Sequence, residues 1–339
     1  MPERHTLQEP AEKAGPEEVM LELTLRPTQW DDYVGQDKVK ENLRLIIDAA
    51  RGRGESCDHL LFYGQAGLGK TTLAYLIGKE LGATVHSTSG PALERAGDIA
   101  ALLSNLEPHD ILFVDEAHRL NKLVEEILYP AMESRRLHLI VGKGPSARTF
   151  SLDLPPFTII AATTRANLLS APLRSRFGAI FRLDYYRTED IEKILARSAR
   201  ILGVTLTQEA FALLAGAARF TPRVANRLLK RTRDYAQVHN HQKIDLEAVE
   251  KTLALLDVDP VGLEHADHEL IRTIIEKFNG GPVGVRALGA SLNEEPGTIE
   301  DIYEPFLMQL GFLERTPGGR VATALAYKHL RLPLKPKLL

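Results

Sequence analysis

The sequence has only one cysteine, Cys57, so it cannot form an internal disulfide, and nothing in it indicates an oxidising compartment. No apolar run approaches the roughly 18 residues that a membrane-spanning helix needs. The N-terminal stretch is polar and acidic, and it lacks the basic flank and apolar core of a secretory signal. We therefore expect a cytoplasmic protein with no membrane partner.

An excess of positive charge is also missing. The chain has 42 lysines and arginines against 45 aspartates and glutamates, which gives a net charge of −3. Proteins that work by neutralising many phosphates are usually basic. Any contact with nucleic acid should therefore be local and modest. With 339 residues, of which 44% are hydrophobic, the chain is long enough for two or three globular domains.

Composition and periodicity divide the chain into four regions. Residues 1–22 are rich in glutamate and interrupted by prolines, which predicts a flexible acidic tail. Residues 23–184 mix helical patterns with short apolar runs, residues 185–257 read as helices alone, and residues 258–339 read as helices followed by a hairpin. A hairpin after short helices is typical of a winged helix-turn-helix.

The apolar runs of the second region indicate its fold. They lie apart in the sequence and are separated by helical stretches, as in a parallel sheet that helices cover on both faces. The predicted fold class is therefore α/β, with a parallel-sheet domain followed by a small helical domain and a winged-helix domain. The three runs are Leu60–Tyr63, Ile111–Val114 and Phe157–Ala162.

A phosphate-binding loop follows the first of these strands. The residues from Gly64 to Thr71 read G-Q-A-G-L-G-K-T and fit the pattern G-x-x-x-x-G-K-[ST] between a strand and a helix. The glycines allow backbone N–H groups to surround phosphates, and the helix start adds its positive end. Lys70 is expected to reach the β- and γ-phosphates and Thr71 to ligate Mg²⁺. ATP and Mg²⁺ are the expected ligands.

Acidic and hydroxyl residues end the other two strands. Asp115 is expected to hold Mg²⁺, and Glu116 to polarise a water for attack on the γ-phosphate. The third strand ends in Thr163 and Thr164, where a hydroxyl, assigned to Thr163, could orient that water. A P-loop kinase for a small molecule would not need the second acid, so these residues favour ATP hydrolysis.

This combination resembles the AAA+ ATPases, and within that class it resembles the RuvB family, the bacterial motors of Holliday junction branch migration. The resemblance covers roughly residues 25–330. Specific strings carry it, among them Asp115-Glu116-Ala117-His118-Arg119-Leu120, Leu128-Tyr129-Pro130-Ala131-Met132-Glu133 and Pro222-Arg223-Val224-Ala225-Asn226-Arg227. It implies ATP-driven branch migration in recombination and DNA repair, by a homohexameric ring on duplex DNA. The alternative is a protein-remodelling or clamp-loader-like AAA+ ATPase.

The resemblance also implies roles for single residues. Arg176 would be the arginine finger that reaches the neighbouring subunit's γ-phosphate, with Arg174 as the competing assignment, and Arg223 would be the lid arginine that acts in cis. Tyr186 would border the adenine, although a core aromatic is an equally good interpretation of that residue. The resemblance implies that Leu25 and Arg26 also border the adenine. The loop residues Gly67, Gly69, Lys70, Thr71 and Thr72 complete the expected nucleotide contacts.

Two further regions bear on partners. A hairpin is predicted over Leu137–Phe150, and the resemblance implies that it docks RuvA, with RuvC joining a larger resolving complex. In the winged domain the second helix is acidic and should face away from DNA, so Arg315 and Arg320 beside the hairpin turn are the expected phosphate contacts. Gly318 stands at a wing-tip position that is often basic in the family.

Overall fold

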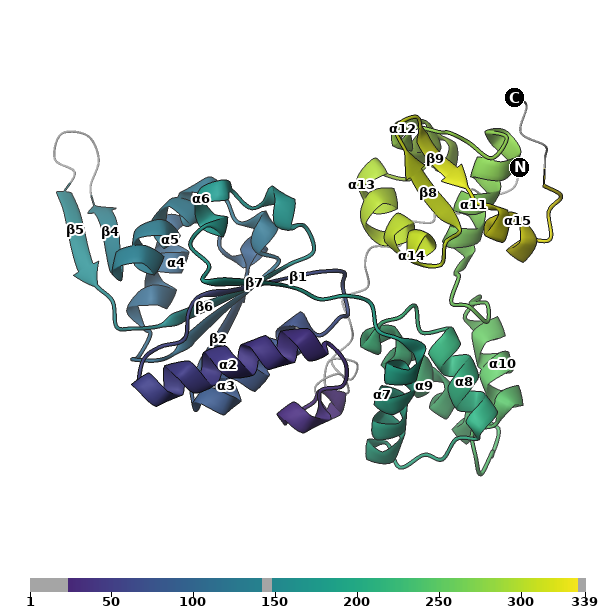
Figure 1. Ribbon diagram of the computed structural model, residues 1–339, viewed down its shortest axis with the longest axis horizontal. Coiled ribbons are helices and arrows are strands. Elements are labelled where there is room, and N and C mark those ends of the chain that lie inside the picture. The colour runs from purple at the N-terminus through teal and green to yellow at the C-terminus, as the bar shows by residue number, and fades with distance from the viewer. Residues whose placement is uncertain (1–23, 142–147, 335–339) are drawn as a thin grey trace, which may run out of the picture. The chain divides into compact units, whose positions relative to one another are not determined.

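The computed structural model describes residues 24–141 and 148–334, and they form two compact units (Figure 1). The first unit runs to Ile194 and also includes Thr221–Asn226; the second comprises Leu195–Phe220 and the residues from Arg227 onward. The predicted acidic tail and the turn of the predicted Leu137–Phe150 hairpin lie outside the described residues. In the described part of the chain, no helix is both long and apolar enough to cross a membrane.

A five-stranded parallel sheet forms the centre of the first unit. Its strand order is β2-β3-β6-β1-β7, and Leu60 of β1 pairs with Ile160 on one side and Ala179 on the other. The sheet confirms the predicted α/β class. Its strands are β1 (Leu60–Tyr63), β2 (Val85–Ser89), β3 (Ile111–Asp115), β6 (Thr158–Thr163) and β7 (Ala179–Arg182).

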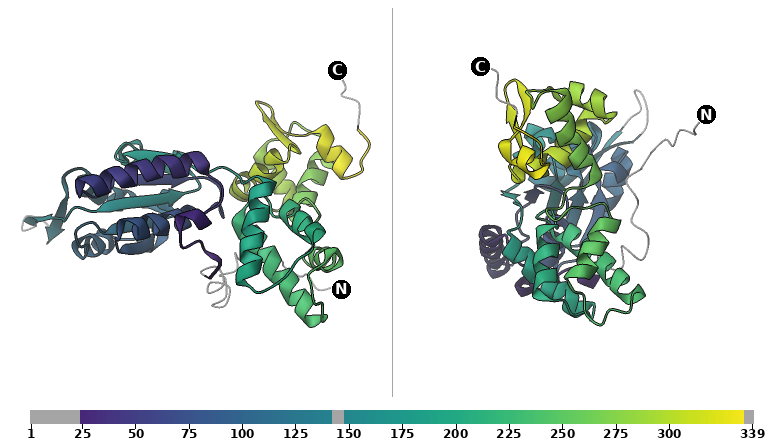
Figure 2. Two further views of the ribbon diagram at one scale, coloured as in Figure 1. Left: turned by 60° about the horizontal axis from the view of Figure 1, so that its bottom comes forward. Right: turned by 90° about the vertical axis from the view of Figure 1, so that its right-hand side faces the viewer.

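Helices cover both faces of this sheet, with α2 and α3 on one side and α4, α5 and α6 on the other (Figures 1 and 2). Because the central strands are buried on both faces, Leu60 and Leu61 are equally inaccessible although they point in opposite directions. The helices are η1 (Trp30–Asp32), α2 (Asp37–Arg53), α3 (Lys70–Leu81), η2 (Gly90–Ala92), α4 (Ala96–Ser104), η3 (Ala117–Arg119), α5 (Lys122–Ser134), η5 (Ala166–Leu168) and α6 (Ala171–Arg174).

The sequence patterns did not reveal the two edge strands. β2 has the sequence VHSTS and is only partly buried, and β7 alternates between partly buried and exposed residues. An edge strand meets solvent along one side, so it needs no continuous apolar run. A separate antiparallel hairpin of β4 (Arg136–Val141) and β5 (Arg148–Asp153) confirms the hairpin that the sequence predicted between β3 and β6.

The second unit contains helices and one small hairpin. Helix α7 (Thr188–Ile201) enters it from the first unit, and α9 (Pro222–Val238) begins among residues that belong to the first unit. These two helices, with α8 (Gln208–Gly216) and α10 (Leu246–Leu255), form the predicted helical lid. Side chains such as Leu214, Leu228 and Val249 are fully or almost fully buried within it.

The winged-helix domain has its own core, to which Leu270, Ile274, Leu307 and Leu313 contribute. The hairpin that the sequence predicted here is present, and it pairs Leu313 with Ala322 and Thr316 with Gly319. The elements are α11 (His265–Lys277), α12 (Val285–Leu292), α13 (Pro296–Thr298), η6 (Ile299–Tyr303), α14 (Glu304–Gln309), β8 (Leu313–Thr316), β9 (Gly319–Ala322) and α15 (Ala324–His329).

Candidate nucleotide-binding site

The phosphate-binding loop joins the end of β1 to the start of α3. Gly67 and Gly69 have φ angles of +79° and +93°, which side-chain-bearing residues rarely adopt. A Cβ on Gly67 would lie 3.0 Å from Cβ of Arg223, and one on Gly69 would lie 2.8 Å from the Tyr33 hydroxyl. The loop is therefore packed between Tyr33 and the start of α9, with no room for side chains at these two positions.

The side chain of Lys70 folds back onto this loop. Its Nζ donates to the carbonyl oxygens of Gly64 and Gln65 at 2.8 and 2.7 Å, and the residue is only 8% exposed. Burial lowers the pKa of Lys70 to about 8, while the negative charge of Asp115 acts in the opposite direction. The Lys70 ammonium therefore lies inside the loop that is expected to surround the nucleotide phosphates, where its positive charge would attract them.

Oxygen ligands for a divalent ion meet beside the loop. The Thr71 hydroxyl donates to Oδ2 of Asp115 at 3.3 Å, and Oδ1 of Asp115 accepts from the backbone N–H of Glu116 at 2.8 Å. Hydroxyl and carboxylate oxygens are the ligands that Mg²⁺ prefers. The structure thus brings together the two residues that the sequence assigned to the metal.

Glu116 occupies a tightly constrained position at the end of β3. Its backbone is left-handed, with φ +48°, and its carbonyl oxygen lies 2.4 Å from where a Cβ on Gly90 would be. The side chain is exposed and forms a 3.0 Å ion pair with Arg119. Glu116 therefore presents its carboxylate at the strand end, where Arg119 holds it.

The hydroxyl of Thr163 is not available to orient a water, contrary to the expectation from sequence. Thr163 is 1% exposed, and its Oγ1 lies 2.9 Å from Nδ1 of His118 and accepts from the Arg165 backbone N–H at 3.0 Å. Burial lowers the pKa of His118. Thr164, the next residue, is exposed. Strand β6 ends at Thr163, and Thr164 lies in the bend that follows, so the two threonines have different surroundings.

Tyr186 supports the loop from the side. It is 5% exposed, its ring lies 2.8 Å from where a Cβ on Gly35 would be, and its hydroxyl donates to the Leu68 carbonyl at 3.4 Å. Burial raises the pKa of Tyr186 to about 12. Tyr33 donates to the same carbonyl at 3.4 Å. The two tyrosines together hold the Leu68 carbonyl in place. No sequence pattern indicated that Tyr33 contacts the loop.

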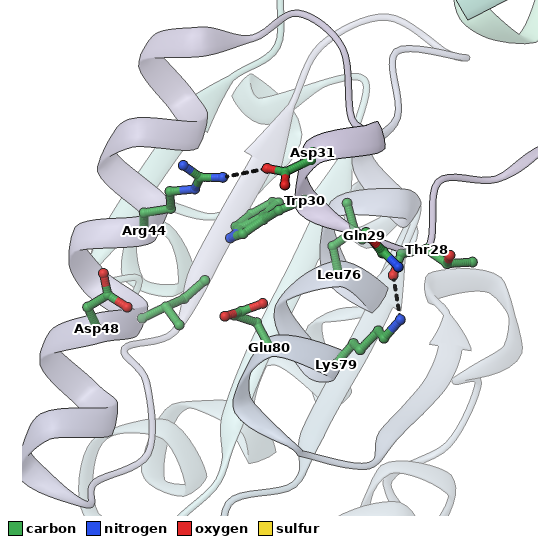
Figure 3. A pocket seen from close by; sticks show the side chains of 10 residues that line it. Thr28, Gln29, Trp30, Asp31, Arg44, Asp48, Leu76, Lys79 and Glu80 are labelled. Carbon is green, nitrogen blue, oxygen red and sulfur yellow. Dashed lines mark hydrogen bonds and ion pairs between the residues drawn. The ribbon is translucent and has the colours of Figure 1, made fainter. Parts of the chain in front are cut away.

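The other residues assigned to the adenine pocket lie in the segment before η1. Leu25 is buried, and the Arg26 guanidinium lies 5.2 Å from the ring centroid of Tyr75 on α3. The segment that follows Arg26 borders a hollow of about 660 Å³ between α2 and α3 (Figure 3). Asp31 pairs with Arg44 at 3.3 Å there, and Lys79 donates to the Thr28 carbonyl. These contacts fasten the segment to both helices.

Two arginines compete for the role of finger. Arg176 is held within its own chain: Nη2 lies 3.0 Å from Oε2 of Glu133, Nη1 donates to the Pro172 carbonyl at 2.6 Å, and the guanidinium lies 4.6 Å from the Tyr129 ring centroid. Its Nε is buried with no hydrogen-bond partner among the described residues. Arg174 is exposed, and in the described part of the chain its guanidinium forms no ion pair.

Both arginines expected to contact DNA lie in an ion-pair network, and the burial of Arg320 corrects the expectation that it contacts a phosphate. Arg320 is 8% exposed, and its guanidinium pairs with Glu304 at 2.6 Å and with Glu300 at 2.7 Å. Arg315 also pairs with Glu304, and its side chain is 49% exposed. Glu300 and Glu304 of the acidic segment therefore face the domain's own hairpin. Opposite charges on adjacent elements neutralise one another, and this holds Arg320 inside the domain.

The strand order, the phosphate-binding loop and the acidic strand end define a P-loop ATPase of the AAA+ class, with a helical lid and a winged-helix domain. Family models match all three parts: the Holliday junction DNA helicase RuvB P-loop domain over residues 25–183, the RuvB AAA lid domain over 186–259 and the RuvB C-terminal winged helix domain over 260–331. The chain belongs to the RuvB family.

Relatives and solved structures agree with this assignment. The chain is 55% identical to Holliday junction branch migration complex subunit RuvB of Dehalococcoides mccartyi, over 94% of this chain and 91% of that protein. It is 56% identical to the protein of the same description from Chloroflexus aggregans, over the same shares. The structure of the Thermotoga maritima RuvB Holliday junction branch migration motor has a TM-score of 0.84 and 46% identity, covering 92% of this chain and 100% of that one.

Proposed function

We propose that this chain is the ATP-driven motor subunit that moves duplex DNA during branch migration of Holliday junctions, in recombination and DNA repair. One observation carries the proposal: a phosphate-binding loop, a helical lid and a winged-helix domain occur in a single chain that matches RuvB proteins over more than nine tenths of its length. The proposed location is the cytoplasm, where such a DNA substrate is found in bacteria.

The proposed nucleotide is ATP bound with Mg²⁺. Thr71 and Asp115 are the proposed metal ligands, since their oxygens lie 3.3 Å apart beside the loop. The metal would neutralise charge on the β- and γ-phosphates when bound. Lys70 would exchange its bonds to the Gly64 and Gln65 carbonyls for bonds to phosphate oxygens. Gly67, Gly69 and Thr72 are proposed to line the phosphates.

Glu116 is proposed to activate the attacking water. To do so its carboxylate must release Arg119, which is 3.0 Å away in this structure. The exposed Thr164 is a better candidate than Thr163 for orienting the water, because the Thr163 hydroxyl already contacts His118. Leu25, Arg26 and Tyr186 remain the proposed border of the adenine.

Hydrolysis is proposed to require a homohexameric ring. Arg176 would reach the γ-phosphate in the neighbouring subunit, and the contact with Glu133 would be broken when it does so. Arg223 would act in cis, because its Cβ lies 3.0 Å from where a Cβ on Gly67 would be. An arginine finger stabilises the charge that spreads over the γ-phosphate oxygens.

Partner contacts are proposed for two hairpins. The β4–β5 hairpin is proposed to dock RuvA, since Phe150 and Leu152 on one face of β5 are exposed apolar side chains. RuvC is proposed to join the larger complex. In the winged domain Arg315 is the better placed of the two arginines to contact a DNA phosphate, because half of its side chain is exposed.

ATP turnover tests this proposal against the alternative of a protein-remodelling or clamp-loader-like ATPase. Turnover should rise when duplex DNA or a four-way junction is added and stay unchanged when an unfolded protein is added. Glu116→Gln is the matched control, because it keeps the side chain's shape and removes its carboxylate. Stimulation by unfolded protein, with no response to DNA, would favour the alternative.

A further inference from the structure

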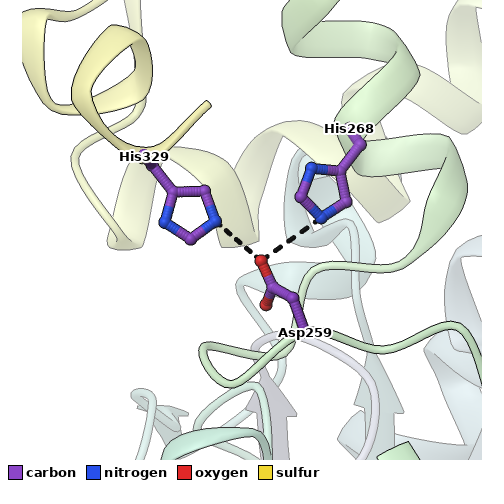
Figure 4. Close-up of side chains that lie close together, drawn as sticks. All are labelled: Asp259, His268 and His329. Atoms are coloured by element: carbon purple, nitrogen blue, oxygen red, sulfur yellow. Dashed lines mark hydrogen bonds and ion pairs between the residues drawn. The ribbon is translucent and has the colours of Figure 1, made fainter. Parts of the chain in front are cut away.

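Three side chains from distant parts of the second unit converge on one point. Asp259 lies in the turn after α10, His268 lies on α11, and His329 is the last residue of α15; both imidazoles point toward the Asp259 carboxylate (Figure 4). Nε2 of His329 lies 2.7 Å from Oδ2 of Asp259, and Nε2 of His268 lies 3.2 Å from the same oxygen. All three candidate ligand atoms lie within 4.8 Å of one another.

The carboxylate is held in this orientation by its other oxygen. Oδ1 of Asp259 accepts backbone N–H bonds from Val261 at 3.0 Å and from Leu263 at 2.8 Å. The Leu263 carbonyl in turn accepts from the Asp259 N–H at 2.9 Å, which closes the turn. Ligands of metal ions are commonly fixed by such hydrogen bonds from outside the coordination sphere. Oδ2 is thus aimed at both imidazoles before any ion arrives.

Ring contacts also hold the two imidazoles in place. Their rings are stacked, with centroids 5.9 Å apart and planes 21° apart, and the ring of Phe312 lies 5.0 Å from that of His329. All three candidate ligands are neither fully buried nor fully exposed, so water and a small ion can reach them. Two imidazole nitrogens and one carboxylate oxygen leave further coordination positions open.

We infer that Asp259, His268 and His329 form a binding site for a divalent transition-metal ion, of which Zn²⁺ is the best match. Zinc binds imidazole nitrogen and carboxylate oxygen at about 2.0–2.2 Å, which puts the ligand atoms about 3.3 Å apart in a tetrahedral site. The two imidazole nitrogens already lie 2.7 and 3.2 Å from the carboxylate oxygen, and the two nitrogens lie within 4.8 Å of each other. Mg²⁺ and Ca²⁺ prefer oxygen ligands alone, so two imidazoles select against them.

Binding requires no net loss of protons from neutral imidazoles. Each ring keeps one N–H, which moves through solvent from Nε2 to Nδ1 and leaves the Nε2 lone pair for the metal. The Asp259 carboxylate exchanges its hydrogen bond with His329 and its close contact with His268 for one metal bond. The ion would link the turn after α10 to α11 and α15, closing a loop between residues 70 positions apart.

Equilibrium dialysis against Zn²⁺ tests the site in the full chain without a polyhistidine tag. Excess Mg²⁺ is included to saturate the oxygen ligands near Thr71. One Zn²⁺ per chain should be retained, and the ion should raise the midpoint of thermal unfolding. His268→Gln and His329→Gln should each weaken Zn²⁺ binding at least tenfold. The His268 side chain is 31% exposed and is not part of the buried core, so its variant should fold and can decide the question alone.

His265→Gln is the matched control, because His265 lies on the same helix, three residues before His268, and outside the cluster. It should bind Zn²⁺ as the parent does. The inference is overturned if the parent retains no Zn²⁺ under these conditions. It is equally overturned if His268→Gln retains as much Zn²⁺ as the parent, since the ion would then lie elsewhere.

Discussion

Arg320 and Glu304 form a buried ion pair in the winged-helix domain, with Nε of the arginine 2.6 Å from Oε1 of the glutamate. Glu304 is 1% exposed, and Arg315 pairs with it from the neighbouring strand. The pair joins the acidic helix α14 to the strand β9. Arg320, one of the two arginines expected to contact DNA, therefore stabilises the fold of the domain.

Replacing Arg320 should destabilise the winged-helix domain. Arg320→Ala leaves the buried Glu304 carboxylate with Arg315 as its remaining partner, and the free energy of unfolding should fall by about 3 kcal/mol. Glu300→Gln is the control: its side chain is 43% exposed, so its removal should cost less than about 1 kcal/mol. Urea unfolding gives the magnitudes, and hydrogen exchange of the β8 and β9 amides assigns them to this domain. Equal stability of parent and Arg320→Ala would show that the pair contributes nothing.

Replacing Arg315 should act on DNA binding instead. The half-exposed side chain can reach a phosphate, so Arg315→Ala should weaken binding to duplex DNA of any sequence and lower the slope of log affinity against log salt by about one unit. Affinities for two unrelated duplexes, measured over a range of salt concentrations, check this. An unchanged slope on both would exclude Arg315 as a phosphate contact.

The affinity for ATP should depend on pH through Lys70. Burial gives the side chain a pKa of about 8 in the nucleotide-free chain, so above that pH the amine is mostly neutral and must gain a proton when ATP binds. The logarithm of ATP affinity should therefore fall above pH 8, with a slope approaching −1. Calorimetric titration between pH 7 and 9.5 measures it. Lys70→Arg keeps its charge throughout and should show no such fall; a flat profile in the parent would refute the assignment.

Substitution should show whether Arg176 or Arg174 is the arginine finger. Arg176→Ala should reduce ATP turnover in assembled rings about a thousandfold while ATP still binds, whereas Arg174→Ala should keep most of its turnover. Glu133→Gln removes the acidic intrachain partner of Arg176, while the contacts with Pro172 and Tyr129 remain, and it should retain or raise turnover. Steady-state turnover and nucleotide titration separate the two effects. If Arg174→Ala is the inactive variant, the finger is Arg174.

Local signals allowed most of the fold to be predicted. The strands β1, β3 and β6 are continuous apolar runs because helices bury them on both faces, and the phosphate-binding loop has a fixed spacing of glycines and lysine. Four lid helices and the winged hairpin follow from periodicity and a glycine-rich turn. The edge strands β2 and β7 were missed because they lack an apolar run.

Side-chain partners that lie far apart in the sequence could not be predicted. Glu304 and Arg320 are 16 residues apart, and a charged helix gives no sign that its carboxylates face its own hairpin. The choice between Thr163 and Thr164 depends on which side of the chain meets His118, 45 residues earlier. The domain boundaries, the RuvA contact and the nucleotide contacts stay predictions.

Branch migration of a synthetic four-way junction measures the central claim most directly. With RuvA and Mg²⁺-ATP present, the parent chain should convert the junction into two duplex products. Glu116→Gln should bind ATP and assemble on the DNA, yet convert no junction, because its amide cannot activate the attacking water. Conversion without ATP, or equal conversion by parent and Glu116→Gln, would contradict the claim that ATP hydrolysis at this site drives the DNA.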